Sequence, residues 1–214
     1  MITLALDTAL GACSVALVDK ARQVALSEPM LRGHQERLAG MAKAVMAEAG
    51  LPFAALERIG VSVGPGSFTG VRVGVAFAKG LSAALSIPCV GVTTLEALAA
   101  EGGDGPLLAV VDGRRDVYVQ AFDDGRAVAE PLALSIEDAR GYCIAALGNR
   151  QIRLIGTGAE RLADLFPDAR IDQRDAASPI QIAAIASRRA AEDIRANPVY
   201  LRAPDARTLA ERGV

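Results

Sequence analysis

Short apolar runs alternate along the chain with longer segments in which apolar residues recur at every third or fourth position. The short runs end near glycine, proline or aspartate, which is typical of buried strands. The longer segments are typical of helices, and glycine or proline follows several of them. We predict strands at residues 2–6, 13–18, 23–26, 59–63, 89–92, 107–111, 117–122, 127–134 and 152–155, and helices at 34–49, 69–85, 94–100, 135–147, 159–165 and 179–194.

The predicted elements occur in the same order twice. Residues 101–106, Glu-Gly-Gly-Asp-Gly-Pro, are the best linker in the sequence. Each half contains three strands, a helix, a strand and a helix (βββαβα), and the first strand of each half ends in an aspartate, Asp7 or Asp112. This order predicts an α/β fold with an N-terminal lobe at 1–103 and a C-terminal lobe at 104–214, with helices packed on mixed sheets. A duplicated unit of this kind is the plan of the actin-like and Hsp70-like (ASKHA) superfamily, which also includes sugar kinases.

The composition suits helices laid on sheets. Of the 214 residues, 51% are hydrophobic and only 4% are aromatic, so aliphatic side chains must fill the interior. Cys13, Cys89 and Cys143 are widely spaced beside apolar residues, which is typical of reduced, buried thiols. The chain begins directly with a predicted strand, and the apolar stretch 71–90 contains two basic residues and a proline. We therefore expect a cytoplasmic protein without membrane contact.

The charge balance argues against nucleic-acid binding by the chain alone. The formal net charge is −2 and the pI is about 5.5, whereas proteins that bind phosphates unaided usually present a basic face. The arginines near the C-terminus are interleaved with acidic residues, which is typical of a solvated surface. Any contact with nucleic acid is therefore expected through a complex.

The segment 64–74, Gly-Pro-Gly-Ser-Phe-Thr-Gly-Val-Arg-Val-Gly, is the strongest local feature. It joins a predicted strand to a predicted helix, and Ser67 or Thr69 can cap that helix. Free amides at a helix start form an anion site. The segment differs from a Walker A loop, because Gly70 is followed by valine and arginine instead of lysine and serine or threonine. A purely structural turn is the alternative.

The helix predicted at 69–85 has one face almost without side-chain bulk and one bulky face. We expect the bulky face to lie on the sheet, which leaves the small face open to close approach by another helix, from within the chain or from a partner. The small face consists of Gly70, Gly74, Ala78 and Ser82, and the bulky face of Val73, Phe77, Leu81 and Leu85.

The helix predicted at 34–49 has two apolar faces. A lobe needs to bury only one of them, so the second is a candidate partner surface. A helix buried on both sides within the chain is the alternative. One face consists of Leu38, Met41 and Val45, and the second of Ala39, Ala42 and Met46.

Residues for metal or nucleophilic chemistry are scarce. His34 is the only histidine, and it lies in a charged segment that we interpret as an exposed helix start. The cysteines are not paired in sequence, and neither an HExxH nor a CxxC motif is present. We therefore predict no catalytic residues, no metal and no cofactor.

Two aspartates stand at the ends of predicted strands, where the ASKHA superfamily places its nucleotide-handling acids. The turn after Asp112 is bulky and charged, so we expect that carboxylate to pair with Arg114 or Arg115 instead of binding Mg²⁺. The candidate vestigial nucleotide site consists of Asp7, Thr8, Ser14 and Asp112.

Several segments match a known family. They read LALDTA (4–9), CSVAL (13–17), HQERL (34–38), GPGSFTGVR (64–72), GVTTLE (91–96), DGRRDVY (112–118) and PVYLR (198–202). Together they resemble the TsaB family, formerly named YeaZ. The resemblance covers nearly the whole chain, is highly specific in the GPGSFTGVR block and is looser in the C-terminal half.

This resemblance implies an actin-like fold and a role in N6-threonylcarbamoylation of the adenosine 3′ of the anticodon in tRNAs that read ANN codons. It implies partnership with a TsaD-type transferase and a TsaE-type ATPase, while a TsaC-type enzyme supplies threonylcarbamoyl-adenylate. Helices 34–49 and 69–85 would contact TsaD, or a second copy of the chain when TsaD is absent. The expected interface is Ala39, Ala42, Met46, Gly70, Gly74, Ala78 and Ser82, and Gly74→Leu is expected to abolish TsaD binding without unfolding the lobe.

Departures from TsaD imply a subunit without catalysis of its own. The ligand positions of the HxxxH metal motif of TsaD fall on Thr94 and Leu98, and its phosphate loop SGGHT is matched by residues 112–115. Residues 156–159 are a faint counterpart of its adenosine loop. One alternative is an independent actin-fold enzyme, either a kinase or an M22-type metallopeptidase, which needs ligands and phosphate loops that this sequence lacks. A homodimeric protein that binds another ligand is the second alternative.

Overall fold

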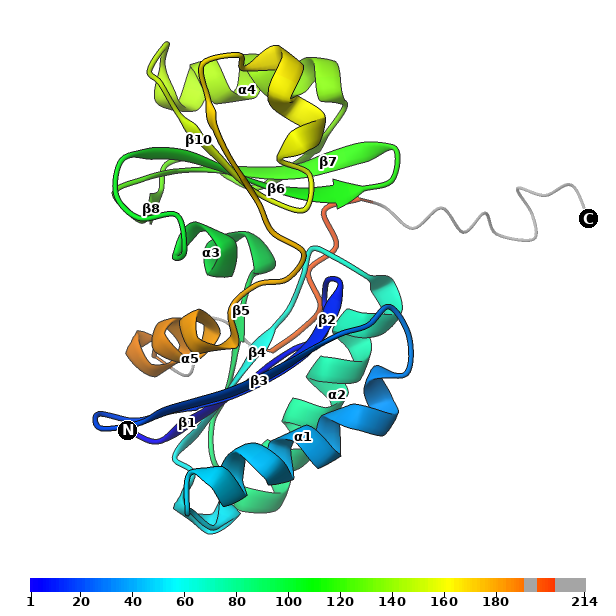
Figure 1. Cartoon of the computed structure of the whole chain (residues 1–214), viewed down its shortest axis with the longest axis vertical. Coiled ribbons are helices and arrows are strands. Elements are labelled where there is room, and N and C mark those ends of the chain that lie inside the picture. The colour runs from blue at the N-terminus through cyan, green and yellow to red at the C-terminus, as the bar shows by residue number, and fades with distance from the viewer. Residues whose placement is uncertain (191–195, 203–214) are drawn as a thin grey trace, which may run out of the picture.

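Two mixed sheets, each with helices on both faces, make up the computed structural model, which describes residues 1–190 and 196–202 (Figure 1). The first sheet has the strand order β3-β2-β1-β4-β5. Its strands β1, β2 and β3 form an antiparallel meander, and β4 and β5 continue the sheet in parallel with β1. The strands are β1 (Thr3–Asp7), β2 (Ala12–Val18), β3 (Gln23–Pro29), β4 (Arg58–Ser62) and β5 (Cys89–Val92).

The second sheet repeats this pattern. Its strand order is β11-β10-β6-β7-β8, and β9 pairs with β7 beside β8. Strands β6 and β7 are antiparallel, whereas β10 and β11 run parallel to β6. The strands are β6 (Pro106–Gly113), β7 (Asp116–Asp123), β8 (Arg126–Ala127), β9 (Leu132–Leu134), β10 (Arg153–Gly156) and β11 (Arg170–Gln173).

The helices form three layers around the two sheets (Figure 1). Helices α1 (His34–Glu48) and α2 (Phe68–Leu85) cover the outer face of the first sheet, and α4 (Ile136–Leu147) with η2 (Glu160–Leu165) covers the outer face of the second. Between the sheets, α3 (Thr94–Ala99) contacts β6, and α5 (Pro179–Arg188) contacts β1, β2 and β4. The predicted two-lobed α/β fold is confirmed, with one qualification: α5 follows the second sheet in sequence but packs on the first. The exact division 1–103 and 104–214 stays a prediction.

Most predicted elements are present, and the differences have local causes. The strand predicted at 127–134 is split into β8 and β9, with Pro131 between them, because proline has no amide to donate to a ladder. The helix predicted at 159–165 is the 3₁₀ helix η2. Strand β11 and the short 3₁₀ helix η1 (Phe53–Ala55) were not predicted, and β11 is a mostly exposed edge strand without an apolar run. The end of the helix predicted at 179–194 lies outside the described residues.

Capping hydrogen bonds fix the starts of the helices. Thr93 and Glu96 form a reciprocal capping box at α3, and the Ser67 hydroxyl accepts from the Gly70 amide at α2. At α4 the Ser135 hydroxyl accepts from the Asp138 amide at 3.2 Å. These caps set where each helix leaves the loop before it.

Helix α2 faces the sheet with its small residues, so the prediction that its bulky face lies there is wrong. A β-carbon added at Gly70 would lie 2.0 Å from the Thr8 carbonyl oxygen, and one at Gly74 would lie 2.5 Å from Thr8 Oγ1. Thr8 Oγ1 in turn donates to the Gly70 carbonyl at 2.7 Å. The bulky residues Val73, Phe77, Leu81 and Leu85 are only partly buried.

Helix α2 is also long and apolar enough to cross a membrane, on length and composition alone. In this fold it packs against β1 and β4 and carries Arg72 and Lys79 on exposed positions. These contacts are those of a helix layered on a sheet.

The packing of Gly74 gives a first prediction. Gly74→Ala displaces Thr8 Oγ1 from its hydrogen bond, and we expect it to lower the free energy of unfolding by about 1–3 kcal/mol. Gly80→Ala is the matched control, because Gly80 lies on the same helix with no atom within 4 Å of an added β-carbon. We expect this control to raise stability by about 0.5–1 kcal/mol.

Urea denaturation of both variants measures these differences. Equal stability of the two alanine variants would contradict the packing. The larger Gly74→Leu substitution is expected to unfold the lobe, which reverses the expectation from the sequence.

Candidate functional site

Five of the seven residues predicted for a partner interface lie in the core of this chain. Ala42 and Met46 of α1 are buried, and so are Gly70, Gly74 and Ala78 of α2. The physical reason is that Leu38, Met41, Ala42, Val45 and Met46 form one continuous inward face of α1 on β2 and β3, while α2 packs on β1 and β4 with its small face. The two apolar faces predicted for α1 are thus a single buried face, apart from Ala39, which is exposed.

The other two predicted interface residues remain at the surface. Ala39 is exposed, and Ser82 is half-buried with its hydroxyl donating to the Ile87 carbonyl at 2.5 Å. The interface role of these residues stays a prediction.

The outward faces of α1 and α2 carry small residues between long charged ones such as Lys43 and Lys79. The two helices contact each other on the same side of the first sheet (Figure 1). Half-buried Phe77 and Leu81 lie beside these small residues on α2. We name the exposed set Ala39, Gly40, Ala44, Ala76, Gly80, Ala83 and Ala84 the small-residue surface. Two of its members on α2, Ala76 and Gly80, are four residues apart in the sequence. The prediction from the sequence considered only the row that begins at Gly70 and so missed this second row of small residues.

Asp7 is fully buried at the end of β1. Burial raises the pKa of its carboxyl group, although hydrogen bonds from the Ser62 hydroxyl and from the backbone amides of Ala9 and Ala177 oppose the shift. Its Oδ1 atom accepts from the Ala9 amide at 3.0 Å and from Ser62 Oγ. The carboxylate is thus enclosed by its own turn and by the segment that precedes α5.

The polar groups around Asp7 are also used within the chain. The Thr8 hydroxyl donates to Gly70, and the Ser14 and Ser27 hydroxyls share a hydrogen bond of 2.8 Å. The Ala9 carbonyl accepts from the Ser67 amide at 2.7 Å, so the loop before α2 lies directly on the turn after β1. In an actin-like site this turn would hold phosphate, and here the Thr8 hydroxyl and the Ala9 carbonyl bond to protein atoms, whereas the buried Asp7 Oδ2 has no hydrogen-bond partner among the described residues.

Asp112 lies apart from Asp7, Thr8 and Ser14, at a cavity that those three residues do not line. Its carboxylate pairs with Arg161 and accepts from the Arg114 amide at 3.0 Å. The predicted ion pair with the Arg114 or Arg115 side chain is therefore wrong, because the partner guanidinium comes from η2. The structure does not gather the four predicted nucleotide residues into one site.

A cavity of about 680 Å³ lies between the two lobes. Its walls come from the loop at the start of α2, the turn after β6 and the segment 196–202, which we name the C-terminal strap. The strap is tied to the first lobe by the Val199 amide, which donates to the Val63 carbonyl at 2.8 Å, and to the second by an ion pair of Arg202 with Asp116 at 3.2 Å. The lining residues are Gly66, Ser67, Phe68, Thr69, Val71, Arg72, Asp112, Gly113, Arg114, Tyr118, Val199, Tyr200 and Arg202.

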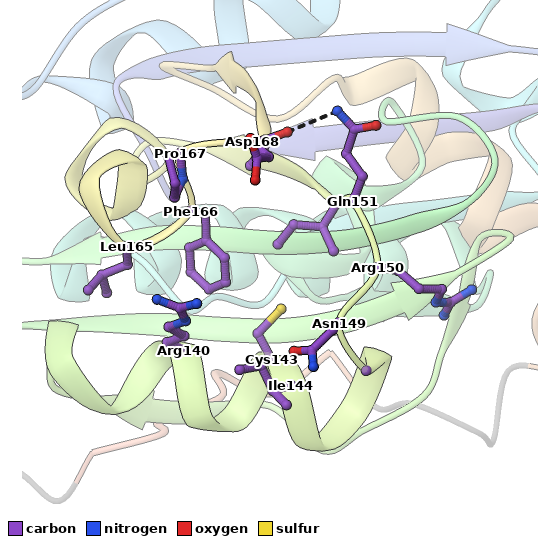
Figure 2. Close-up of a pocket in the computed structure, with 13 residues that line it drawn as sticks. Arg140, Cys143, Ile144, Asn149, Arg150, Gln151, Leu165, Phe166, Pro167 and Asp168 are labelled. Atoms are coloured by element: carbon purple, nitrogen blue, oxygen red, sulfur yellow. Dashed lines mark hydrogen bonds between the residues drawn. The ribbon is translucent and has the colours of Figure 1, made fainter.

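A second cavity, of about 370 Å³, lies in the C-terminal lobe between α4 and the segment after η2 (Figure 2). Its floor includes Cys143 and Phe166, and Arg140 lies at its side. Gln151 Nε2 donates to the Asp168 carbonyl across one edge at 3.0 Å. Burial raises the pKa of the Cys143 thiol to about 11, so the only candidate nucleophile here is protonated at neutral pH.

No group of three metal-ligating side chains comes together within residues 1–190 and 196–202. His34 is 5% exposed and lies at the first residue of α1, so the helix start that was interpreted as exposed is buried at this residue, which is a structural position. The helix buries it because its ring shares the inward face with Leu38 and Met41. Thr94 and Leu98, at the positions of the TsaD metal ligands, are buried as well.

Solved structures from Pseudomonas aeruginosa share this fold over most of the chain. One, described as an uncharacterized protein with similarity to peptidase YEAZ, is 29% identical with a TM-score of 0.79 and covers 94% of this chain and 99% of its own. Another, YeaZ itself, is 30% identical with a TM-score of 0.75 and the same coverage.

Curated sequences and a family profile agree with these structures. An uncharacterized protein of Mycobacterium tuberculosis is 34% identical, over 97% of this chain and 94% of its own. The tRNA threonylcarbamoyladenosine biosynthesis protein TsaB of Escherichia coli is 37% identical over 55% of this chain and 53% of its own. The TsaD profile, described as tRNA N6-adenosine threonylcarbamoyltransferase, matches residues 28–197. The chain therefore belongs to the TsaB (YeaZ) family, within the wider group that this profile covers.

Proposed function

We propose that this protein acts in the biosynthesis of threonylcarbamoyladenosine in tRNA, as a non-catalytic subunit that binds and activates a TsaD-type transferase. Membership of the TsaB family supports the pathway. The observation that carries the role of a docking subunit is the small-residue surface on α1 and α2. A helix pair with alanine and glycine on its outer face lets partner helices approach closely over a wide area.

The absence of catalysis by this chain is supported by how its polar groups are used. Asp7 is enclosed, and the turn after it hydrogen-bonds to the loop before α2. The positions that hold metal in TsaD carry the buried residues Thr94 and Leu98 here. A threonine hydroxyl is a poor metal ligand, and a leucine side chain has no atom that can bind a metal. Although one solved relative is described as similar to a peptidase, a metallopeptidase would need ligands from elsewhere.

The other members of the complex follow from the same family. We propose that a TsaE-type ATPase joins the chain and its TsaD-type partner, and that two copies of the chain pair through the small-residue surface when TsaD is absent. The net charge of −2 favours contact with tRNA through the complex. The proposed compartment is the cytoplasm.

Ala76→Arg tests the docking role of the small-residue surface. Ala76 is exposed on α2, so a long charged side chain there leaves the core intact but blocks close helix approach. We expect at least tenfold weaker binding to the TsaD-type subunit in titration calorimetry. Ala145→Arg on α4 is the matched control, because Ala145 is exposed on a helix of the other lobe, and its binding should match the unsubstituted protein.

Reconstituted tRNA modification gives the functional readout of the same variants. Modification by the TsaD-type subunit should require this chain, should fall in parallel with binding for Ala76→Arg and should be kept for Ala145→Arg. Full binding by a folded Ala76→Arg variant would remove this surface from the proposal, and modification that does not need the chain would remove the function.

Asp7→Asn tests whether the role of Asp7 is structural or catalytic. Because burial raises the pKa of Asp7 in the folded state, its contribution to stability is largest below the unfolded pKa near 3.8 and is lost as pH rises through the folded pKa. We expect the stability of Asp7→Asn, relative to the unsubstituted protein, to increase from pH 4 to pH 7 in urea denaturation. Reconstituted modification should be unchanged, whereas its loss in a folded variant would assign Asp7 a catalytic role.

A further inference from the structure

The cavity of about 370 Å³ in the C-terminal lobe lies apart from the small-residue surface, which belongs to the first lobe (Figure 2). One of its walls is α4 with the turn that follows, and the opposite wall is the segment 165–169. Its volume of about 370 Å³ falls in the range of about 300–1,000 Å³ that small-molecule sites occupy. The size of this cavity therefore suits a ligand of low molecular mass.

Hydrogen bonds within the chain hold both walls of this cavity in place. In the first wall, Arg150 Nε donates to the Leu147 carbonyl at 2.9 Å, and the Arg150 guanidinium pairs with Asp123 at 2.7 Å. These bonds fix the turn after α4. In the opposite wall, the Ala169 amide donates to the Phe166 carbonyl at 2.9 Å and closes a turn. The shape of the cavity is thus set by the fold.

The floor of the cavity is apolar. Cys143 and Ile152 are 2% and 5% exposed, and Leu165 and Phe166 lie half-buried beside them. Figure 2 shows the Cys143 sulfur directed from α4 into the cavity. Burial raises the pKa of this thiol to about 11, so the sulfur is a neutral, polarisable surface at neutral pH. An apolar group of a ligand is favoured on this floor because it leaves water there.

The two walls of the cavity carry one open charge of each sign. Arg140 lies on α4 and Asp168 follows η2, and both are exposed residues that line the cavity. Within the described part of the chain, neither side chain has an ion-pair or hydrogen-bond partner. Arg150, the third charged residue of the lining, is already paired. Figure 2 shows Arg140 extending from α4 toward the wall that carries Phe166 and Asp168.

We propose that this cavity binds a small zwitterion with an apolar side chain, either a free amino acid or a short peptide. Arg140 pairs with the carboxylate of the ligand, because a guanidinium binds carboxylates in a bidentate geometry. Asp168 pairs with the ammonium group, and the apolar side chain lies on Cys143 and Phe166. One cation and one anion beside an apolar floor favour this class over a phosphate, which Asp168 would repel. The site goes beyond the proposed docking function.

Saturation-transfer NMR on the full-length chain tests the site, with leucine and leucylleucine as probes for the two sources. We expect Arg140→Ala and Asp168→Asn each to weaken binding of the probe by about tenfold. Arg170→Ala and Asp164→Asn are the matched controls, because both residues are exposed in the same lobe but do not line the cavity. Their binding should stay within about twofold of the unsubstituted protein.

Analogues of leucine test the two charges separately. Isocaproate keeps the carboxylate, isoamylamine keeps the ammonium group, and both keep the apolar side chain. Because each analogue leaves one charged side chain of the cavity without a partner, we expect it to bind about tenfold more weakly than leucine.

Every result of these titrations supports or overturns the proposal. Leucine binding that depends on Arg140 and Asp168 supports a free amino acid, and binding of the dipeptide alone with the same dependence supports a peptide. Binding of neither probe at millimolar concentration, or equal binding by Arg140→Ala and Arg170→Ala, overturns the site. Equal affinity for isocaproate or isoamylamine overturns the zwitterion.

The competing occupant is an apolar side chain of a protein partner. Equal affinity for N-acetyl-leucine amide, which carries no charge, would assign the cavity to such a partner instead. Binding of the TsaD-type subunit, measured on the same variants, keeps failure of this site distinct from failure of the docking function.

Discussion

The close contact between the turn after β1 and the loop before α2 determines much of the first lobe. The Ser67 amide donates to the Ala9 carbonyl, and the Thr8 hydroxyl donates to the Gly70 carbonyl. This approach leaves no space for a β-carbon at Gly66 or Gly70, where an added one would lie 2.3 and 2.0 Å from backbone oxygens. The GPGSFTG block is therefore explained first by packing, because any larger residue would separate the helix from the sheet.

The same contact also determines how several polar groups of the turn after β1 are used. A phosphate loop must leave its backbone donors open to a ligand. Here the Thr8 hydroxyl and the Ala9 carbonyl bond to the loop before α2 and its first turn, and Asp7 is closed off from solvent, which raises the pKa of its carboxyl group. Asp7 is thus enclosed in the interior, whereas Ala76 and Gly80 lie exposed on the outer face of α2.

Sequence patterns predicted the fold well and the site poorly, for one physical reason. Apolar runs bounded by glycine and proline report local burial, so the elements and the repeated order were accessible. The orientation of α2 on the sheet could not be predicted, because the row that begins at Gly70 and the row that contains Phe77 are both apolar. Only the contact with Thr8, which is 62 residues from Gly70 in the sequence, decides which row faces the sheet. Likewise the Arg161 partner of Asp112 is 49 residues away, and no spacing rule reaches it.

Helix α2 joins the two outward features of the molecule. Its first turn contributes Phe68 and Arg72 to the wall of the cavity between the lobes, and its outer face contributes Ala76 and Gly80 to the small-residue surface. The inner face is packed on β1 and β4, with contacts at Gly70 and Gly74 that leave no space for a β-carbon, so the helix is held firmly on its sheet. Phe68 and Arg72 at the cavity and Ala76 and Gly80 on the small-residue surface therefore belong to one helix that is packed on one sheet. The C-terminal strap, which bonds to Val63 on one side and to Asp116 on the other, connects that lobe to the second.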